Sequence, residues 1–129
     1  MKTQNNPPTP FELFGVEVHK GWWPLIEPIY NRIQQLNAEG AGIEISQIKE
    51  KFGMLCIYVH HAPDEIYEMI RKAEEQSIHI CEDCGEPAER IVGEHKWIYT
   101  LCPKCLEKRG IKVVETLEEA NARRKNGGK

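Results

Sequence analysis

Four of the five cysteines stand in two pairs in the C-terminal half of the chain, and their spacing constrains the fold more than any other feature. Cys81 and Cys84 form one Cys-x2-Cys pair and Cys102 and Cys105 form the other, with 17 residues between the pairs. Four-cysteine zinc sites have this spacing, because two tight turns can each direct two sulfurs at one tetrahedral ion, about 2.3 Å away. We therefore expect these four thiolates to bind one structural Zn²⁺, and residues 81–110 to form a zinc ribbon.

A zinc ion held by four thiolates has no open coordination position, whereas a catalytic zinc keeps one for water or substrate. The expected ion therefore contributes folding energy, and its removal should loosen the ribbon. Two histidines are weaker candidates for the site: His95 as an alternative ligand, and His79 as a donor to a cysteine sulfur. The alternative to a zinc site is four unpaired or disulfide-linked cysteines.

The residues before the cysteine pairs predict two helices and a β-hairpin. Apolar residues recur on one helical face over residues 22–36, and Pro24 is acceptable near the start of that helix. Residues 42–61 predict a hairpin in which Gly53 supplies the positive φ of a tight turn. Its second strand is apolar on both faces, so we expect it to be covered on both sides. Residues 63–77 predict the second helix.

These patterns predict an α+β fold, with two helices on a small antiparallel sheet and a C-terminal four-cysteine zinc ribbon. A short strand is expected over residues 14–18, where apolar and other residues alternate. Thr116 and Glu119 fit a capping box at the start of a last, short helix. The expected divisions are a disordered N-terminus (1–10), an α+β domain (11–80), the zinc ribbon (81–110), and a short helix with a flexible basic tail (111–129).

The charge distribution argues against a general nucleic-acid-coating role. The formal net charge is −3, from 17 Lys and Arg against 20 Asp and Glu. Residues 111–129 are the basic part, with five Lys and Arg against three Glu, whereas non-specific binding needs many cations that neutralise phosphates. No apolar run approaches the roughly 18 residues of a membrane span, and the N-terminus lacks the apolar core of a secretory signal. We therefore expect a cytoplasmic protein that does not bind membranes.

The fifth cysteine, Cys56, lies in the apolar second strand of the hairpin, where a small buried side chain is expected. An enzyme that uses Cys56 with His60 or His61 is the alternative. A reactive thiol needs a cationic or helix-start setting, and neighbouring residues on a strand point to opposite faces. No cationic or helix-start setting is visible around Cys56, and the adjacent residues His60 and His61 cannot easily serve one site. The sequence also contains no phosphate-binding glycine loop and no nucleophile elbow. The sequence therefore predicts a protein without enzymatic activity.

Two segments are candidates for contact with a partner. Adjacent tryptophans on a helix do not share a face, so one can fill the core while the other lies at the rim. The tip of the hairpin projects and can present a recognition loop. The alternatives are core packing for both tryptophans and a solvated turn for the tip, and we expect Trp97 to pack over the ribbon core. The candidate partner-binding residues are Trp22, Trp23, Lys49, Lys51 and Phe52.

Four segments in a fixed order resemble a family of small proteins from bacteriophages, prophages and their hosts. They are GWWPLIEPIYNRI, QIKEKFGMLCIYV, DEIYEMIRKAEEQS, and ICEDCG with WIYTLCPKC, which together run from Gly21 to Lys108. That family commonly has Arg where this chain has Cys56, which weakens any role for the second strand as a site. It can have His where this chain has Cys105, which leaves zinc binding intact. The resemblance implies this fold, a metal role for the four cysteines and a phage context, but no reaction.

Taken together, the sequence predicts a small zinc-stabilised adaptor or inhibitor that binds a protein partner, in the phage context a host protein in the host cytoplasm. The alternative is a nucleic-acid-binding accessory protein that uses the ribbon and the basic tail. The oligomeric state is left open.

Overall fold

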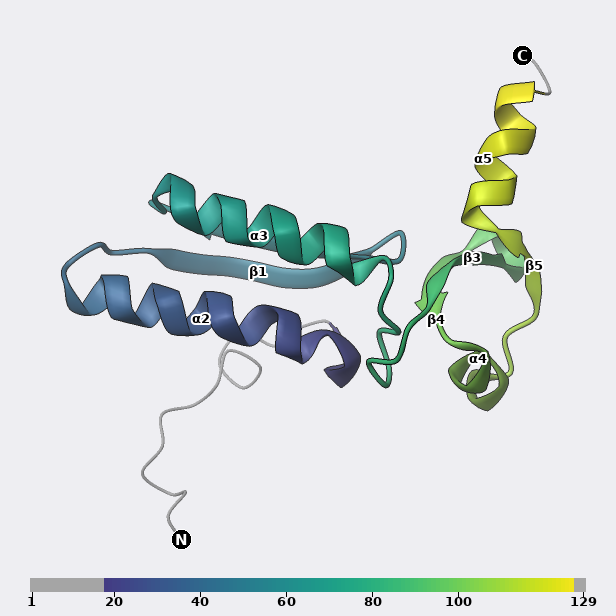
Figure 1. Ribbon diagram of the computed structural model, residues 1–129, viewed down its shortest axis with the longest axis horizontal. Coiled ribbons are helices and arrows are strands. Elements are labelled where there is room, and N and C mark those ends of the chain that lie inside the picture. Colours follow the sequence, from purple (N-terminus) through teal and green to yellow (C-terminus); the bar gives the residue numbers. More distant parts are fainter. Residues whose placement is uncertain (1–17, 127–129) are drawn as a thin grey trace, which may run out of the picture.

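The computed structural model describes residues 18–126 of the 129. The chain forms two parts that lie end to end, an N-terminal α+β part and a C-terminal ribbon part (Figure 1). The predicted fold class is confirmed, since both sheets are small and antiparallel and the four paired cysteines lie in the C-terminal part. The N-terminal elements are the 3₁₀ turn η2 (Lys20–Trp22), α2 (Trp23–Ala38), β1 (Glu44–Lys51), β2 (Met54–His60) and α3 (Asp64–Ser77).

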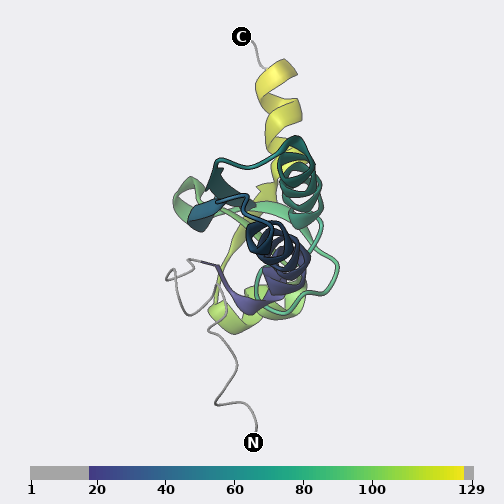
Figure 2. The same cartoon turned by 90° about the vertical axis from the view of Figure 1, so that its left-hand side faces the viewer.

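Helices α2 and α3 lie side by side and pack on the β1–β2 hairpin (Figures 1 and 2). The apolar stripe of α2 buries Ile26, Ile29 and Ile33, as the helical period predicts. The side chain of Asn37 then closes the turn into β1, because its amide donates to the carbonyl of Ile43 at 3.0 Å and its oxygen accepts from the Ile43 N–H at 2.7 Å. These two hydrogen bonds therefore fix the loop that connects α2 to the hairpin.

The hairpin turn has two residues, since Lys51 pairs with Met54 across the strands. Phe52 and Gly53 both have positive φ, +54° and +74°, which is the backbone conformation of a type I′ turn. The carboxylate of Glu50 accepts a hydrogen bond of 2.7 Å from the Gly53 N–H and so fixes the turn. The predicted turn at Gly53 is confirmed, and Phe52 occupies a position where Asn or Gly is usual.

The expectation that β2 is covered on both faces is wrong. Leu55, Ile57 and Val59 face the core, while Tyr58 is 42% exposed on the opposite face. Period-2 alternation and a one-sided core explain the pattern better than a central position, because this sheet has two strands and helices cover one face.

Helix α3 satisfies backbone donors of β2 with its own side chains. The Ser77 hydroxyl, fully buried, accepts from the Leu55 N–H at 2.9 Å and donates to the Glu74 carbonyl. The Glu74 carboxylate accepts from the Ile57 N–H at 3.0 Å. These bonds fix where α3 lies along the strand, beyond what apolar packing alone would specify.

The ribbon part has a three-stranded antiparallel sheet in the order β4-β3-β5. The ribbon was expected to end at residue 110, but the strand β5 lies beyond that boundary and pairs with β3. The short helix expected in the last segment is present as far as Asn126, and it projects from the body of the molecule (Figures 1 and 2). The elements are β3 (Glu89–Gly93), the turn η3 (Glu94–Lys96), β4 (Ile98–Leu101), α4 (Pro103–Arg109), β5 (Val113–Thr116) and α5 (Leu117–Asn126).

The predicted capping box at the start of α5 is confirmed. The Thr116 N–H donates to the Glu119 carboxylate at 2.9 Å, and the Glu119 N–H donates to the Thr116 hydroxyl at 3.0 Å. The predictions of disorder over residues 1–10 and of a strand over 14–18 concern residues that, apart from Val18, lie outside the described part. Over residues 18–126, no helix has the length and apolar character needed to cross a membrane.

Candidate metal centre

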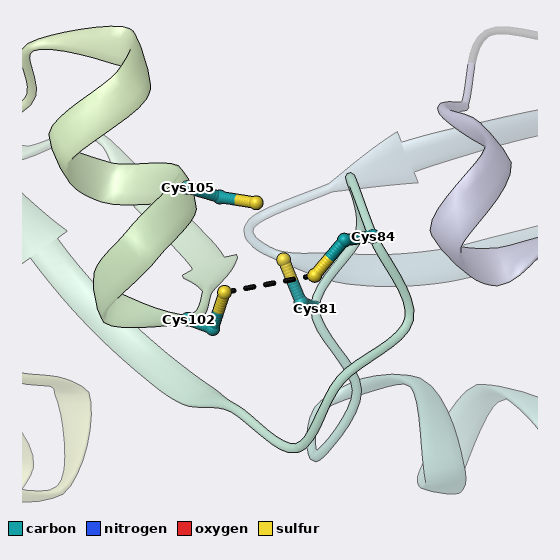
Figure 3. Close-up of side chains that lie close together, drawn as sticks. All are labelled: Cys81, Cys84, Cys102 and Cys105. Atoms are coloured by element: carbon teal, nitrogen blue, oxygen red, sulfur yellow. Dashed lines mark hydrogen bonds between the residues drawn. The ribbon is translucent and has the colours of Figure 1, made fainter.

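The first cysteine pair lies on the loop between α3 and β3. Gly85, at φ +86°, donates its N–H to the Cys81 carbonyl at 2.9 Å, and the Cys81 N–H donates to the Glu86 carbonyl at 2.7 Å. The positive φ favours glycine directly after the pair. This tight turn directs the sulfurs of Cys81 and Cys84 to the same side (Figure 3).

The second pair spans the start of α4. Cys102 is the N-cap residue, in extended conformation, Pro103 occupies the first turn, and Cys105 lies one turn along the helix. The backbone N–H of Cys105 bonds to the sulfur of Cys102 and holds the pKa of that thiol at about 7, so thiolate forms readily there. Burial and the neighbouring sulfurs instead raise the pKa of Cys105. A bound cation would favour the thiolate form at both positions.

The four sulfurs converge, as predicted. All four ligand atoms lie within 4.8 Å of one another, and the Sγ atoms of Cys84 and Cys102 are 3.6 Å apart (Figure 3). That separation excludes a disulfide, which needs about 2.05 Å. It approaches the roughly 3.8 Å edge of a tetrahedron with 2.3 Å metal–sulfur bonds. Cys84 is exposed and the other three cysteines are buried, so the cluster could hold a metal ion at the surface of the ribbon part.

Neither candidate histidine joins this group of ligand atoms. His95 lies exposed in the turn η3, between β3 and β4, with a φ of +65°. His79 precedes the first cysteine and is exposed, with its backbone carbonyl accepting from Ala88. The site is therefore a four-sulfur site.

Charged side chains brace the cluster from both sides. Arg109 of α4 forms a two-pronged ion pair with Asp83, at 2.8 and 2.6 Å, which ties the second cysteine pair to the first. Its guanidinium also lies 5.9 Å from the ring centroid of Tyr99. The adjacent Glu82 is buried, and its carboxylate accepts from the Thr100 N–H at 3.0 Å. Burial raises the pKa of Glu82 to about 7.

The loop that carries Cys81 and Cys84 also contacts the N-terminal part of the molecule. We call this contact region between the two parts the joint. The Gly21 N–H donates to the Glu82 carbonyl at 2.9 Å, and the indole N–H of Trp22 donates to the Ile80 carbonyl at 2.8 Å. A Cβ at Gly21 would lie 2.6 Å from the Glu82 carbonyl carbon and oxygen, and closer still to the Cys81 carbonyl oxygen. Only glycine allows this approach of the two backbones.

The hairpin tip provides a second contact across the joint. The Thr100 hydroxyl, fully buried, donates to the Gly53 carbonyl, and a Cβ at Gly53 would lie 3.1 Å from that hydroxyl and 3.2 Å from the Ile98 side chain. Sequence reasoning assigned Gly53 to the turn alone and gave Gly21 no role. No pattern in the sequence indicated these contacts, because they depend on how the two parts of the molecule pack together.

The candidate partner-binding residues differ in their exposure to solvent. Trp22 is fully buried, so its proposed contact with a partner is wrong, because its ring fills the core and its N–H serves the joint. Trp23 is 38% exposed at the rim of the helix. At the hairpin tip, Lys49 is half-buried, whereas Lys51 and Phe52 are exposed.

Trp97 does not pack over the ribbon core as expected. Its side chain is 59% exposed, and its ring centroid lies 6.5 Å from that of Tyr99. Trp97 directly precedes β4, and Tyr99 and Leu101, at alternate positions of that strand, pack on the ribbon core in its place. The exposed tryptophan was therefore missed as a surface residue.

Cys56 is buried in β2, as predicted. Burial, followed by the nearby Glu74 carboxylate, raises the pKa of its thiol, which disfavours the nucleophilic thiolate. His60 and His61 are exposed at the end of the same strand. Their ring centroids lie 6.4 Å apart.

Comparison of the chain with models of protein families, with curated proteins and with solved structures finds no match. The assignment of the site therefore rests on its own geometry and on the chemistry of four sulfur donors.

Proposed function

We propose that this chain is a non-enzymatic protein-binding module whose fold is stabilised by one structural Zn²⁺. The observation that carries the proposal is the pair of large exposed rings, Phe52 and Trp97, which come from different parts of the molecule and line one hollow between them. Aromatic side chains are enriched among the anchors of protein interfaces, and two that line one hollow form a patch instead of isolated exposed residues.

The zinc assignment is supported by the donor set. Thiolates are soft ligands, and four of them around a tetrahedron suit Zn²⁺ better than the hard cations Mg²⁺ and Ca²⁺. With four protein ligands no position is open for a substrate, so the ion has a structural role. It would hold the loop that contacts Gly21 against α4, which directly follows the strand β4 that contacts the hairpin tip, and would thus fix the two parts relative to each other.

The metal proposal is tested by measuring zinc in the purified full chain. We expect about one Zn²⁺ per chain, lost in Cys81→Ser and retained in the matched control Cys56→Ala, because Cys56 lies outside the cluster. Retention of zinc by Cys81→Ser, or its absence from the unmodified chain, would contradict a four-cysteine zinc site.

The absence of enzymatic activity is supported by the setting of Cys56. A buried thiol with a raised pKa beside a carboxylate is the opposite of an activated nucleophile. A thiol-alkylation rate at Cys56 above that of an unfolded peptide would restore the enzymatic alternative.

The resemblance to phage and prophage proteins gives the proposal a specific form. In that context the module acts in the host cytoplasm as an adaptor or inhibitor that binds a host protein. Its small size and the single rigid joint suit a protein that presents one surface, and its net charge of −3 does not favour a nucleic-acid partner.

A nucleic-acid-binding accessory protein is the second candidate, and one observation favours it. Arg123 and Arg124 line a hollow of about 400 Å³ between α5 and the ribbon sheet, together with His95 and Lys96. The Arg123 guanidinium is already paired with Glu115, which reduces the charge available for phosphate. Binding through this surface should fall steeply with salt.

The test is affinity purification of the zinc-loaded chain from a bacterial host lysate, with and without nuclease, with Cys81→Ser as the misfolded control. A stoichiometric protein partner that survives nuclease and is absent from the Cys81→Ser sample supports the proposal. Partners that vanish with nuclease, and a salt-dependent affinity for nucleic acid, would put the second candidate in its place.

A further inference from the structure

A small hollow lies between the hairpin tip and the ribbon part. It has a volume of about 210 Å³, and its lining comes from residues that are far apart in the sequence. The Gly53 backbone packs against Ile98 and Thr100 beneath it, so its two walls are held together by the joint. The lining residues are Glu50, Lys51, Phe52, Lys96, Trp97 and Ile98.

The two aromatic side chains that line the hollow are largely exposed to solvent. Phe52 is 65% exposed and Trp97 is 59% exposed. Phe52 also has a φ of +54°, in a turn position where a bulky side chain is disfavoured and Asn or Gly is the usual choice. Neither burial nor turn chemistry therefore accounts for a phenylalanine at this position.

The rim of the hollow is cationic on a chain that is acidic overall. Lys51 and Lys96 line it, and the Lys51 ammonium lies 5.9 Å from the centroid of the Phe52 ring. The carboxylate of Glu50 is directed into the turn, where it accepts from the Gly53 N–H. An apolar hollow between two lysines is complementary to an apolar group flanked by negative charge.

We propose that this hollow binds an apolar side chain, of leucine or phenylalanine type, presented by an acidic segment of a partner protein. The proposal rests on the proposed protein-binding function and names the surface and the chemistry of the partner. A volume of about 210 Å³ is below the roughly 300–1,000 Å³ of cofactor and small-molecule sites and suits one or two side chains. Aromatic residues around a small pocket are the usual setting of an interface hot spot.

A single-stranded nucleic acid fits the hollow less well. Such strands are bound along grooves in which successive cations track the phosphates and successive rings stack with bases. Here the lining of the hollow holds two lysines and two aromatic rings, which is much shorter than such a track. An acidic peptide meets these two charges without requiring a longer basic track.

The binding test uses the full zinc-loaded chain and a panel of short synthetic peptides, followed by amide and indole NMR shifts. Each peptide carries one central Leu, Ile, Phe or Tyr flanked by Glu and Asp. Matched peptides replace the acidic residues by Lys or the central residue by Ala, and an oligothymidylate of about 12 nucleotides serves as the nucleic-acid probe. We expect at least one acidic peptide to shift Phe52, Lys96 and the Trp97 indole with a Kd of about 0.1–1 mM, and both matched peptides to fail.

Substitutions locate the site. Phe52→Asn removes the ring while suiting the positive φ, so the hairpin should fold normally, and binding should weaken at least about 5-fold. Trp97→Ala should weaken it similarly, and Lys51→Glu about 2–5-fold with a larger effect at low salt. Tyr67→Ala and Lys72→Glu are matched controls on the exposed face of α3, and they should bind like the unmodified chain.

The proposal is overturned if no acidic peptide shifts the residues of the hollow, if Phe52→Asn binds unchanged, or if the oligothymidylate binds there more tightly than the peptides. The proposed function is tested separately by the affinity purification. A nuclease-resistant partner that Phe52→Asn and Trp97→Ala still retain keeps the function and rejects the hollow. Failure to capture any protein rejects the function itself.

Discussion

Replacing Gly21 with alanine tests whether the two parts of the molecule are held together by direct backbone contact. A Cβ at this position would lie 2.6 Å from the carbonyl carbon and oxygen of Glu82, and closer still to the Cys81 carbonyl oxygen, where ordinary contacts begin near 3.4 Å; the backbones must therefore separate by at least about 0.8 Å. That shift lengthens the 2.9 Å hydrogen bond from the Gly21 N–H to Glu82 beyond bonding distance. It also strains the neighbouring bond from the Trp22 indole to Ile80.

The expected cost follows from these contacts. Overpacking costs about 1–3 kcal/mol, and each of the two hydrogen bonds contributes about 1 kcal/mol net, so Gly21→Ala should lower the free energy of unfolding by about 3–5 kcal/mol. Loss of the joint should also let the two parts unfold separately, which lowers the apparent m-value. Gly110→Ala is the matched control, because its φ of +71° costs about 1–2 kcal/mol while nothing lies within 4 Å of the new Cβ.

Urea unfolding of the zinc-loaded chain, followed by tryptophan fluorescence and far-UV circular dichroism, measures both quantities. Fluorescence reports on the three tryptophans, of which Trp22 is the buried one at the joint, and circular dichroism reports mainly on the helices. A loss below about 1 kcal/mol with an unchanged m-value would refute the reasoning, because the two backbones could then separate without consequence.

Three further predictions concern hydrogen bonds, titration and the metal. Ser77→Ala should lower the free energy of unfolding by about 1–3 kcal/mol, because it leaves the buried Leu55 N–H unsatisfied. The control Ser46→Ala, at an exposed position, should lower it by less than about 0.5 kcal/mol. Urea unfolding measures both values. Burial raises the pKa of Glu74 above 4.5, so the folded chain binds more protons than the unfolded chain and stability falls as pH rises from 4.5 through the raised value. Glu74→Gln should show a smaller fall in stability as the pH rises from 4.5 in the same assay. Chelation of zinc should speed amide hydrogen exchange over residues 81–110 more than in α2 and α3, and equal protection with and without metal would contradict a structural ion.

Local patterns in the sequence predicted most of the elements. The capping box of Thr116 and Glu119 and the turn at Gly53 depend on residues a few positions apart, and both have the expected geometry. The apolar stripes of α2 and α3 depend on the helical period in the same way. The strand β5 was missed because its partner β3 lies some 20 residues earlier, and a four-residue strand carries little local signal.

The cysteine cluster is a long-range feature that the sequence nevertheless predicted. One metal ion must bind all its ligands at once, so two Cys-x2-Cys pairs predict proximity across the 17 residues between them. The ligands are therefore identifiable from chemistry, without knowledge of the fold.

The surface at the joint was decided by the tertiary structure alone. Phe52 and Trp97 share a hollow because two backbone contacts hold the parts together. Gly53 packs on Ile98 and Thr100, and Gly21 packs closely on the loop that carries the first cysteine pair. No period or spacing in the sequence predicts which two backbones will approach closely, since that depends on which surfaces remain uncovered after each part has folded. Residue type and local geometry thus determined the helices, the hairpin and the metal ligands, whereas docking of the two parts determined which aromatic side chains stay exposed and what they face.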